Sequence, residues 1–357
     1  MKIYETGLQD VHRAREVIDK DLEQFIEQWR TTFDQGSLDG MEAYCQIVLR
    51  GGKRLRGILA MQSYYAHGGT DAAVATGVAR VLELVQAYLL VLDDIADRSD
   101  TRRGGPSAHR IVQRMAEEEG MRGDAAHYGE AQAVNAALCG AHKAALELLE
   151  MPVSDAVIRR ALTSLHKNIG ITGTGQMNDI YNEATGQALD EAAIERVLTQ
   201  KSAYYTFVNP LELGACLAGE EVLTESLHRY GVYTGCAFQI TDDLIGSFGA
   251  SAETGKSTND DIREGKMTLL AQYALAHAAD PDHQQLRSVL GDTDATESEC
   301  DAVREIMINT GAYDYAKARS QWYAEQARGA LAEASTLDRE FISFLDQLIE
   351  YVTSRKS

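Results

Sequence analysis

Apolar residues along this chain recur at the three- and four-residue spacing of amphipathic helices. The first such stretch includes Val11, Ile18, Leu22, Phe25 and Trp29, with charged residues between them. A second stretch, 78–92, reads VARVLELVQAYLLVL and is apolar on nearly every side towards its end. We therefore expect that end to be buried among other helices.

The rest of the chain continues this helical pattern, and we find no strand-like alternation in it. Further helices are predicted over 106–118, 127–150, 153–170, 171–185, 190–218, 222–249, 265–279, 294–310 and 312–354. Pro210 lies inside one of them, where a proline would release the carbonyl of Thr206 and bend the helix. A kink is therefore predicted close to Lys201.

Composition supports an all-α protein. The 357 residues include only 4 prolines, and no Gly/Ser/Pro-rich linker or low-complexity tract divides the chain. Length alone would allow two domains. Without a linker, the simpler interpretation is one all-helical domain over residues 1–357, folded as a single large helical bundle.

Charge and cysteine usage restrict the partners and the compartment. The net charge of -20 argues against a nucleic-acid partner, because such binding depends on Lys and Arg at the phosphates. The five cysteines form no C-x-x-C pair, which suits reduced thiols in the cytosol. The first residues do not resemble a signal peptide, and no segment approaches 18 uninterrupted apolar residues. We expect a soluble, cytoplasmic protein with no integral membrane segment.

An acidic cluster follows the second apolar stretch directly. On a helix, Asp93 and Asp97 share one face and Asp94 lies nearby, so three carboxylates crowd together. Beside a buried helix this crowding is costly unless a cation binds. Carboxylates without His or Cys favour Mg²⁺, which often shares its ligands between carboxylates and a substrate phosphate. The alternative is a solvated acidic helix end, although acid there opposes the helix dipole.

A second acidic pair repeats this layout. Asp242 and Asp243 follow the apolar-rich stretch YTGCAFQIT and precede a glycine-rich loop with Lys256, Asp261 and Lys266. Two carboxylate-bearing helices that meet across a cavity could hold several Mg²⁺ ions around one diphosphate, which turns a poor leaving group into a good one. The lysines would bind the remaining phosphate oxygens.

Basic residues gather at two places in this acidic chain. The segment RGGKRLR (50–56) carries four cations around two glycines, which indicates an anion site. Taken alone, it could equally be a helix start with solvated charges. Arg102 and Arg103 follow the first acidic cluster, and their guanidinium groups suit phosphate oxygens. The alternative for this pair is a surface ion pair with Asp100.

Together, and in this order, these features resemble the trans-isoprenyl diphosphate synthases, the family that contains farnesyl and geranylgeranyl diphosphate synthases. The matching motifs are GGKRLR (51–56), QAYLLVLDDIAD (86–97), RRG (102–104), GQMND (175–179), KSAYY (201–205), FQITDD (238–243), TGK (254–256) and DDIREGK (260–266). The resemblance implies an all-α bundle around a central cavity, and a homodimer.

The resemblance also implies which residues bind the substrates and the metal. Isopentenyl diphosphate would be bound by Lys53, Arg56, Gln86 and Arg103. The allylic diphosphate would be bound by Arg102, Lys201, Lys256 and Lys266, with Ser202 and Gln239 as further substrate-binding residues. Mg²⁺, up to three ions per site, would be held by Asp93, Asp94, Asp97, Asp242 and Asp243.

The implied reaction begins with ionisation of the allylic C–O bond. The isopentenyl double bond attacks the resulting cation, and a proton is lost to the departing diphosphate. Such a cation requires a closed apolar cavity with oxygen dipoles near the developing charge. Gln239, Tyr205 and backbone carbonyls near Lys201 are candidates for these dipoles. The implied catalytic residues are Lys201, Tyr205, Gln239 and Arg102.

This sequence departs from the family pattern at two positions. Gly246 stands where the second acidic motif usually has a third aspartate. Because Mg²⁺ keeps several waters and often uses one or two carboxylates, we expect activity to survive and Gly246→Asp to change Mg²⁺ affinity modestly at most. Ser202 replaces a threonine and retains the hydroxyl.

Product length in the family is set just before the first acidic motif, where this chain has Tyr88 and Leu89. An aromatic ring five residues before Asp93 would block long products, whereas Leu89 is smaller than the second aromatic of many farnesyl enzymes. This pattern favours C20 or C15 products without choosing between them.

Three other interpretations compete with this one. A class I terpene cyclase also uses an aspartate-rich helix and Mg²⁺, but it has no second diphosphate substrate and no need for GGKRLR with Gln86. A non-catalytic subunit of a heteromeric prenyl synthase is favoured only by Gly246. A helical scaffold with solvated acidic patches is disfavoured by the ordered series of motifs.

The basic residues Arg355 and Lys356 could close over isopentenyl diphosphate or be simple chain ends.

Overall fold

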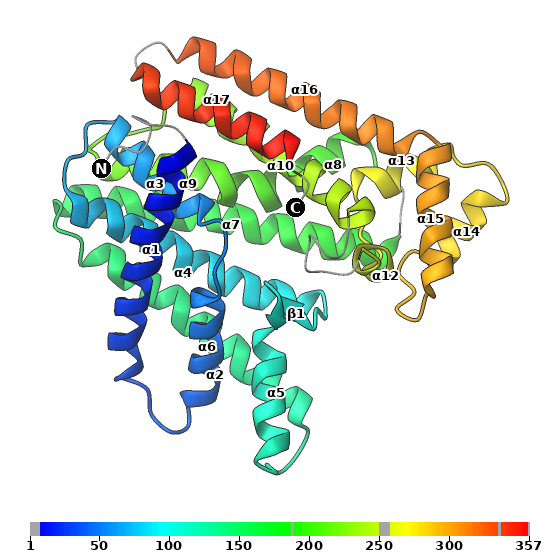
Figure 1. Cartoon of the computed structure of the whole chain (residues 1–357), viewed down its shortest axis with the longest axis horizontal. Helices are drawn as coiled ribbons and strands as arrows, with labels where there is room; N and C mark the ends of the chain where they lie inside the picture. Colours follow the sequence, from blue (N-terminus) through cyan, green and yellow to red (C-terminus); the bar gives the residue numbers. More distant parts are fainter. Residues whose placement is uncertain (1–7, 187–188, 250–257, 335–336, 356–357) are drawn as a thin grey trace. The chain divides into compact units, whose positions relative to one another are not determined.

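A computed structural model describes residues 8–186, 189–249, 258–334 and 337–355 of the chain. Nearly all of the regular structure in these residues is helical (Figure 1), which confirms the all-α prediction. The chain divides into two compact units, and each is described by itself. The first comprises Met1–Ser164 with Pro210–Val222, and the second Leu165–Asn209 with Leu223–Ser357. The expectation of one bundle around a central cavity stays a prediction.

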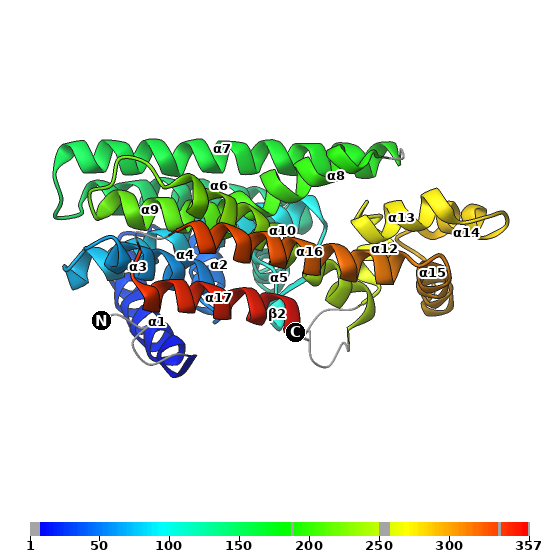
Figure 2. The same cartoon turned by 90° about the horizontal axis from the view of Figure 1, so that it is seen from above.

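Helix α4 (Ala72–Ala96) is the core helix of the first unit. It begins at Asp71, whose carboxylate accepts a hydrogen bond from the N–H of Ala73 at 2.8 Å. The helices α3 and α6 pack against it (Figure 2), as do α1, α2 and α5. The bounds of these helices are α1 Leu8–Arg30, α2 Leu38–Leu49, α3 Leu55–Ala66, α5 Ala108–Glu118 and α6 Ala125–Leu149.

The apolar stretch of α4 is buried over most of its length. Val78, Leu84 and Val91 are each 0% exposed, whereas Leu92 is 40% exposed. The predicted burial is therefore wrong for the last residue, because the helix end that carries the aspartates is less covered. Among the described residues, α4 is the one helix long and apolar enough to cross a membrane, yet 72% of its most apolar window is buried within the protein. Such burial is typical of a core helix.

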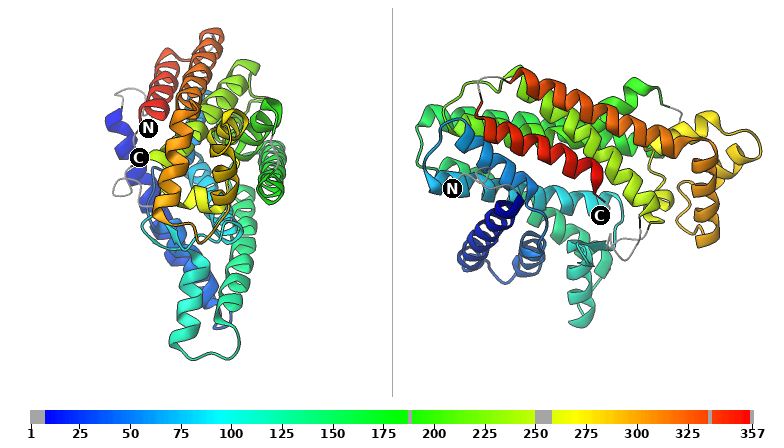
Figure 3. Two further views of the ribbon diagram at one scale, coloured as in Figure 1. Left: turned by 90° about the vertical axis from the view of Figure 1, so that its right-hand side faces the viewer. Right: turned by 45° about the horizontal axis from the view of Figure 1, so that its top comes forward.

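The second unit is built around α10 (Glu225–Phe248). This helix packs against η2, α16 and α17, and Figure 3 shows α16 and α17 side by side. The bounds of the other elements are α8 Glu191–Val197, η2 Leu198–Val208, α12 Asp260–Glu264, α13 Leu269–His277, α14 Asp282–Val289, α15 Glu297–Asn309, α16 Ala312–Glu333 and α17 Arg339–Ser354. Two helices contribute residues to both units, α7 (Asp155–Thr185) and α9 (Asn209–Leu217).

Several predicted boundaries are wrong. The predicted helices 153–170 and 171–185 are one helix, α7, and the predicted helix 312–354 is two, α16 and α17. The signal for the second break was Asp338, a helix N-cap whose carboxylate accepts a hydrogen bond from the N–H of Glu340 at 3.0 Å. The predicted helix 190–218 contains three elements, and α2, α3, α12 and α14 had no counterpart among the predictions.

The structure also contains one small hairpin that was not predicted. Strands β1 (Thr101–Arg102) and β2 (Gly105–Pro106) pair antiparallel, with Thr101 opposite Pro106. Strands of two residues are too short to show the alternation by which sequence patterns reveal a strand. The hairpin matters because it carries the two arginines that follow the first acidic motif.

Candidate active site

The glycine-rich turn between α2 and α3 lies against Arg103. Gly51 and Gly52 have φ angles of +68° and +134°, conformations that glycine adopts without steric cost. A Cβ atom at Gly52 would lie 3.1 Å from Cζ of Arg103. The two glycines therefore form the turn and leave room for this guanidinium group.

Gln86 of α4 connects two arginines of the first unit. With its amide oriented to satisfy both neighbours, its oxygen accepts hydrogen bonds from Arg56 Nη1 at 3.0 Å and Arg103 Nη2 at 3.1 Å. Burial lowers the pKa of Arg103 to about 10, Glu83 opposes this effect, and nearby arginines including Arg56 add to it. Two close, largely buried guanidinium groups would be stabilised by a bound anion. Lys53, on the same turn, is exposed.

The other two arginines of the basic segment have structural contacts instead. Arg54 is 3% exposed and pairs with Asp19 at 2.7 Å and Glu83 at 2.9 Å. Arg50 donates a hydrogen bond to the carbonyl of Pro106 in the hairpin at 2.5 Å. Arg50 and Arg54 therefore stabilise the fold. Of the four cations in 50–56, only Lys53 and Arg56 remain as candidates for binding an anion.

The hairpin turn gives Arg102 and Arg103 different surroundings. Arg103 and Gly104 form the two-residue turn with φ angles of +53° and +72°, as in a type I′ turn. Arg102, one residue earlier, donates from Nε to Asp94 Oδ1 at 2.7 Å and approaches Asp93 Oδ2 at 3.5 Å. Arg103 therefore contacts Gln86, whereas Arg102 contacts the first acidic motif.

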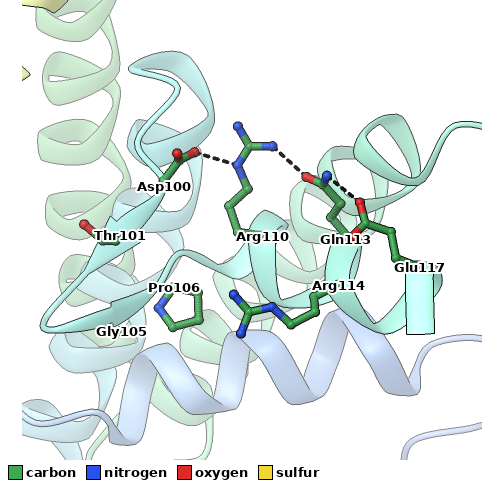
Figure 4. A pocket seen from close by; sticks show the side chains of 8 residues that line it. All are labelled: Asp100, Thr101, Gly105, Pro106, Arg110, Gln113, Arg114 and Glu117. Atoms are coloured by element: carbon green, nitrogen blue, oxygen red, sulfur yellow. Dashed lines mark hydrogen bonds and ion pairs between the residues drawn. The ribbon is translucent and has the colours of Figure 1, made fainter. Parts of the chain in front are cut away.

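The alternative pairing of this arginine pair with Asp100 is wrong. Asp100 pairs with Arg110 of α5 at 2.7 Å. These two residues, with Gln113, border a surface cavity of about 510 Å³ beside the hairpin (Figure 4). The cavity is lined by Asp100, Thr101, Gly105, Pro106, Arg110, Gln113, Arg114 and Glu117, none of which is a predicted site residue.

The three carboxylates of the first acidic motif differ in exposure. The side chain of Asp94 is fully buried, that of Asp93 is 28% exposed, and Asp97 is the C-cap of α4. As these side chains stand, no group of three or more His, Cys, Asp or Glu within the described residues could hold a metal ion. The guanidinium of Arg102 supplies positive charge to the carboxylates of Asp93 and Asp94. Carboxylate oxygens are the ligands that Mg²⁺ prefers, so these residues fit the ion if they bind it and Arg102 together.

In the second unit, Lys201 lies in a π-helix rather than at a sharp kink. The π-helix η2 ends at Val208, and Pro210 lies in the first turn of α9. The two elements are continuous, because the N–H of Asn209, just before the proline, donates to the carbonyl of Tyr204 five residues earlier. A kink was predicted close to Lys201, and the structure instead has the wide turns of a π-helix there, which often occur at functional sites.

Two glycines allow the neighbouring helices to approach η2 closely. A Cβ atom at Gly175 of α7 would collide with the backbone nitrogen of Lys201, and one at Gly235 of α10 with Cα of Ala203. The Nζ of Lys201 forms an ion pair with Asp179, one turn after Gly175. The motif GQMND therefore has two roles: Gly175 lets α7 approach η2 closely, and Asp179 pairs with Lys201.

Ser202, Gln239 and Asp243 form a hydrogen-bonded chain from η2 to the second acidic motif. Ser202 Oγ donates to Gln239 Oε1 at 2.6 Å, and Gln239 Nε2 donates to Asp243 Oδ1 at 2.7 Å. Burial and the negative charge of Asp261 raise the pKa of Asp243 to about 8. A buried carboxyl group among other acids fits a divalent cation. Tyr205, also on η2, is half-buried.

Asp242 of the second motif and Asp261 of α12 are each paired with a cation. Asp242, with a side chain 53% exposed, accepts a hydrogen bond from Arg355 at 2.9 Å. Lys266 Nζ donates to Asp261 Oδ1 at 3.0 Å, which places this predicted phosphate ligand beside the motif. Lys256 lies outside the described residues.

The two predicted chain-length residues lie on α4 before the first motif. Tyr88 is 9% exposed, and burial raises its pKa above the ordinary value. Leu89 is half-buried. A second tyrosine, Tyr44 of α2, is fully buried, and its hydroxyl donates a hydrogen bond to the carbonyl of Leu84 at 2.8 Å. Leu84 lies on α4 one helical turn before Tyr88, and therefore further from Asp93.

Sequence reasoning did not assign roles to Asp179 and Asp261. Both stand in quoted motifs, GQMND and DDIREGK, but a single carboxylate on a helix usually means a solvated surface. The signal that distinguishes them is a lysine partner within the quoted motifs. Asp179 pairs with Lys201 of KSAYY, and Asp261 pairs with Lys266 of its own motif.

An all-α fold with acidic residues at helix ends beside buried arginines is typical of enzymes that act on diphosphates with a divalent metal. A family model described as polyprenyl synthetase matches residues 40–307. The chain therefore belongs to the polyprenyl synthetase family, and it is a prenyltransferase.

Named relatives align over most of this chain. A geranylfarnesyl diphosphate synthase of Aeropyrum pernix is 29% identical over 320 residues, 88% of this chain and 93% of its own. A geranylgeranyl diphosphate synthase of Saccharolobus solfataricus is 28% identical over 316 residues, 88% of this chain and 90% of its own. The solved geranylgeranyl pyrophosphate synthase of Corynebacterium glutamicum, complexed with isoprenyl diphosphate and magnesium, has a TM-score of 0.89 at 30% identity and covers 96% of this chain and 98% of its own.

Proposed function

We propose that this prenyltransferase condenses isopentenyl diphosphate with an allylic diphosphate, and that its main product is the C20 geranylgeranyl diphosphate. The observation that carries this proposal is the position of Gln86. It lies on α4 seven residues, two helical turns or about 10 Å, before Asp93. One helix face thus bears both an anion site and an acidic motif, which a two-substrate enzyme needs and a terpene cyclase does not.

The groups around Gln86 would bind isopentenyl diphosphate. Arg56 and Arg103 converge on the amide oxygen of Gln86, so their positions are fixed before a ligand arrives. Lys53 is exposed on the glycine-rich turn and would add a further contact. A diphosphate there would offset the burial and the repulsion between arginines that together lower the pKa of Arg103.

The acidic motifs would bind the allylic diphosphate through Mg²⁺. Asp93, Asp94 and Asp97 in the first unit, and Asp242 and Asp243 in the second, supply oxygen ligands only, and up to three ions would be held. Bound Mg²⁺ would neutralise the diphosphate so that it can depart. Arg102, Lys201, Lys256 and Lys266 would bind phosphate oxygens that the metal does not contact.

Neutral oxygen atoms of the second unit would stabilise the allylic cation. Gln239 is fixed by its bonds to Ser202 and Asp243, which turn its oxygen towards η2. Tyr205 and the backbone carbonyls of η2 would add dipoles that need no reorientation during the reaction. No protein nucleophile is required, because the isopentenyl double bond forms the new bond and the diphosphate accepts the proton.

The choice of C20 rests on the residues before Asp93. A buried ring at Tyr88 would stop a growing chain, and Leu89 leaves more space than a second aromatic would. Geranylgeranyl synthases are among the named relatives and solved structures that this chain resembles. Both facts favour C20 over the C15 farnesyl diphosphate.

A homodimer is part of the proposal. The helix α6 exposes four large apolar side chains, Val134 (42%), Leu138 (55%), Leu146 (50%) and Leu149 (49%). Exposed apolar side chains on one helix indicate a protein partner, and a second copy of this chain is the simplest. Leu138→Asp should convert a dimer into a monomer in sedimentation analysis, with Val17→Asp on α1 as a control of comparable exposure.

We place the enzyme in the cytoplasm, where its five free cysteines stay reduced.

The decisive experiment is product analysis by mass spectrometry. The purified protein would be given Mg²⁺, isopentenyl diphosphate and, separately, dimethylallyl, geranyl or farnesyl diphosphate. A C20 diphosphate from each starter, no product without isopentenyl diphosphate, and loss of product with a chelator are expected. Product formed from an allylic diphosphate alone would indicate a terpene cyclase. No turnover by the purified chain would indicate a subunit that needs a partner.

A further inference from the structure

A carboxylate from another helix occupies the place of the missing third aspartate. Gly246 lies on α10, one turn after Asp242. A Cβ atom at Gly246 would collide with Oδ2 of Asp261 and would lie 3.4 Å from its Cγ. Asp261 belongs to α12, fifteen residues further along the chain. The space where a side chain at position 246 would begin is therefore filled by a carboxylate.

The helix α12 is anchored in a way that fixes this carboxylate. Ile262 is 1% exposed, and Arg263 donates to the carbonyl of Ala295 at 3.0 Å from Nε and 2.8 Å from Nη2. Lys266 donates to Oδ1 of Asp261 at 3.0 Å. With Oδ1 held by the lysine, Oδ2 points to α10. The position of Asp261 is thus fixed by the buried side chain of Ile262 and by the hydrogen bonds of Arg263 and Lys266.

Asp261 also lies beside the second acidic motif. Its Oδ2 occupies the place of a Cβ atom at Gly246, one helical turn after Asp242. Asp243 lies on the same helix, and its side chain is buried. A carboxylate of α12 is therefore held next to the segment of α10 that carries Asp242 and Asp243.

We propose that Asp261 replaces the third aspartate of the second motif, and that Gly246 is the residue that admits it. Asp261 would contact Mg²⁺ directly or through one of the waters that this ion retains. The inference rests on the proposed function, since it names a further residue of the same metal site. It also revises the expectation that Gly246→Asp has little effect, because an aspartate at position 246 would compete with Asp261 for one space.

A reciprocal exchange tests this inference. The variants are Asp261→Ala, Gly246→Asp and the double variant, with Asp260→Asn as a control that removes a negative charge from the same helix. Calorimetry would measure Mg²⁺-dependent binding of inorganic diphosphate, which needs no turnover. We expect Asp261→Ala to weaken binding about 10-fold or more and Gly246→Asp to weaken it as well. The double variant should return to within about threefold of the wild type.

Equal binding by the wild type and Asp261→Ala would overturn the inference, as would a double variant no better than Asp261→Ala. Thermal melting without Mg²⁺ would establish that each variant is folded, and Asp261→Asn, which keeps the shape, would replace an unfolded alanine variant. If the wild type itself neither binds Mg²⁺ with diphosphate nor turns over, the proposed function fails. If it does both and Asp261→Ala matches it, only the present inference fails.

Discussion

Arg355 donates a hydrogen bond to Oδ1 of Asp242 at 2.9 Å, and its guanidinium carbon lies 4.0 Å from the centre of the Phe238 ring. The side chain of Arg355 is 6% exposed. A cation from the segment after α17 is therefore held against a proposed metal ligand. The basic residues near position 355 were expected either to close over isopentenyl diphosphate or to be simple ends. In this structure Arg355 contacts the second acidic motif, and Lys356 lies outside the described residues.

Removal of Arg355 should strengthen Mg²⁺ binding. The ion pair competes with the metal for Asp242, and a pair with one exposed partner is worth about 0.2–1 kcal/mol, so Arg355→Ala should lower the apparent Kd by at most about fivefold. Magnesium titration in the presence of inorganic diphosphate would measure this. Arg328→Ala, which breaks an exposed pair with Asp346 at 3.1 Å, should leave the Kd unchanged. A Kd that rises in Arg355→Ala would show that the arginine assists binding.

Substitution of Asp93 and of Asp94 should separate activity from stability. Either change to Asn should lower turnover at least about 100-fold, because each removes a charged metal ligand. Asp94 is fully buried against Arg102, so Asp94→Asn should also lower the free energy of unfolding by about 3 kcal/mol or more. Asp93→Asn should leave stability nearly unchanged. Turnover assays and urea denaturation would test both expectations, and equal stability losses would contradict them.

Two arginines of the first unit should respond differently to replacement. Arg103→Met should raise the KM for isopentenyl diphosphate about 10- to 100-fold with little effect on the KM for the allylic substrate, since charged hydrogen bonds are worth about 1.5–3 kcal/mol. Arg54→Met should instead cost about 3–5 kcal/mol of stability, because it leaves Glu83 buried without its cation. Steady-state kinetics and thermal melting would distinguish the two. A raised allylic KM in Arg103→Met would reassign this residue.

Shortening Tyr88 should lengthen the product. Tyr88→Ala removes the first buried ring that a chain growing along α4 would meet, and Tyr44 lies at Leu84, about 6 Å further along the helix. The single variant should therefore yield products longer than C20 but still limited, and Tyr88→Ala with Tyr44→Phe should behave like the single variant because the ring remains. Mass spectrometry of the products would show this. An unchanged product would mean that the ring of Tyr88 is not the floor of the tunnel.

The sequence alone determined the features that depend on neighbours along the chain. Helical spacing aligned Gln86 with Asp93 on α4, and the two glycines of GGKRLR required a turn with positive φ angles. The acidic motifs could be recognised because their residues are consecutive or one turn apart. Each of these consequences follows from local backbone geometry.

Only the tertiary structure decided which charges meet. Arg54 and Arg56 are two residues apart, yet the first pairs with Asp19 and Glu83 while the second binds Gln86. Likewise, only packing revealed that Asp261 fills the space beside Gly246. Such pairings join residues distant in sequence, and they depend on how helices are placed and which side chains are buried. No local pattern contains that information, so the position that reads in the sequence as the loss of an aspartate is occupied in the structure by a carboxylate from another helix.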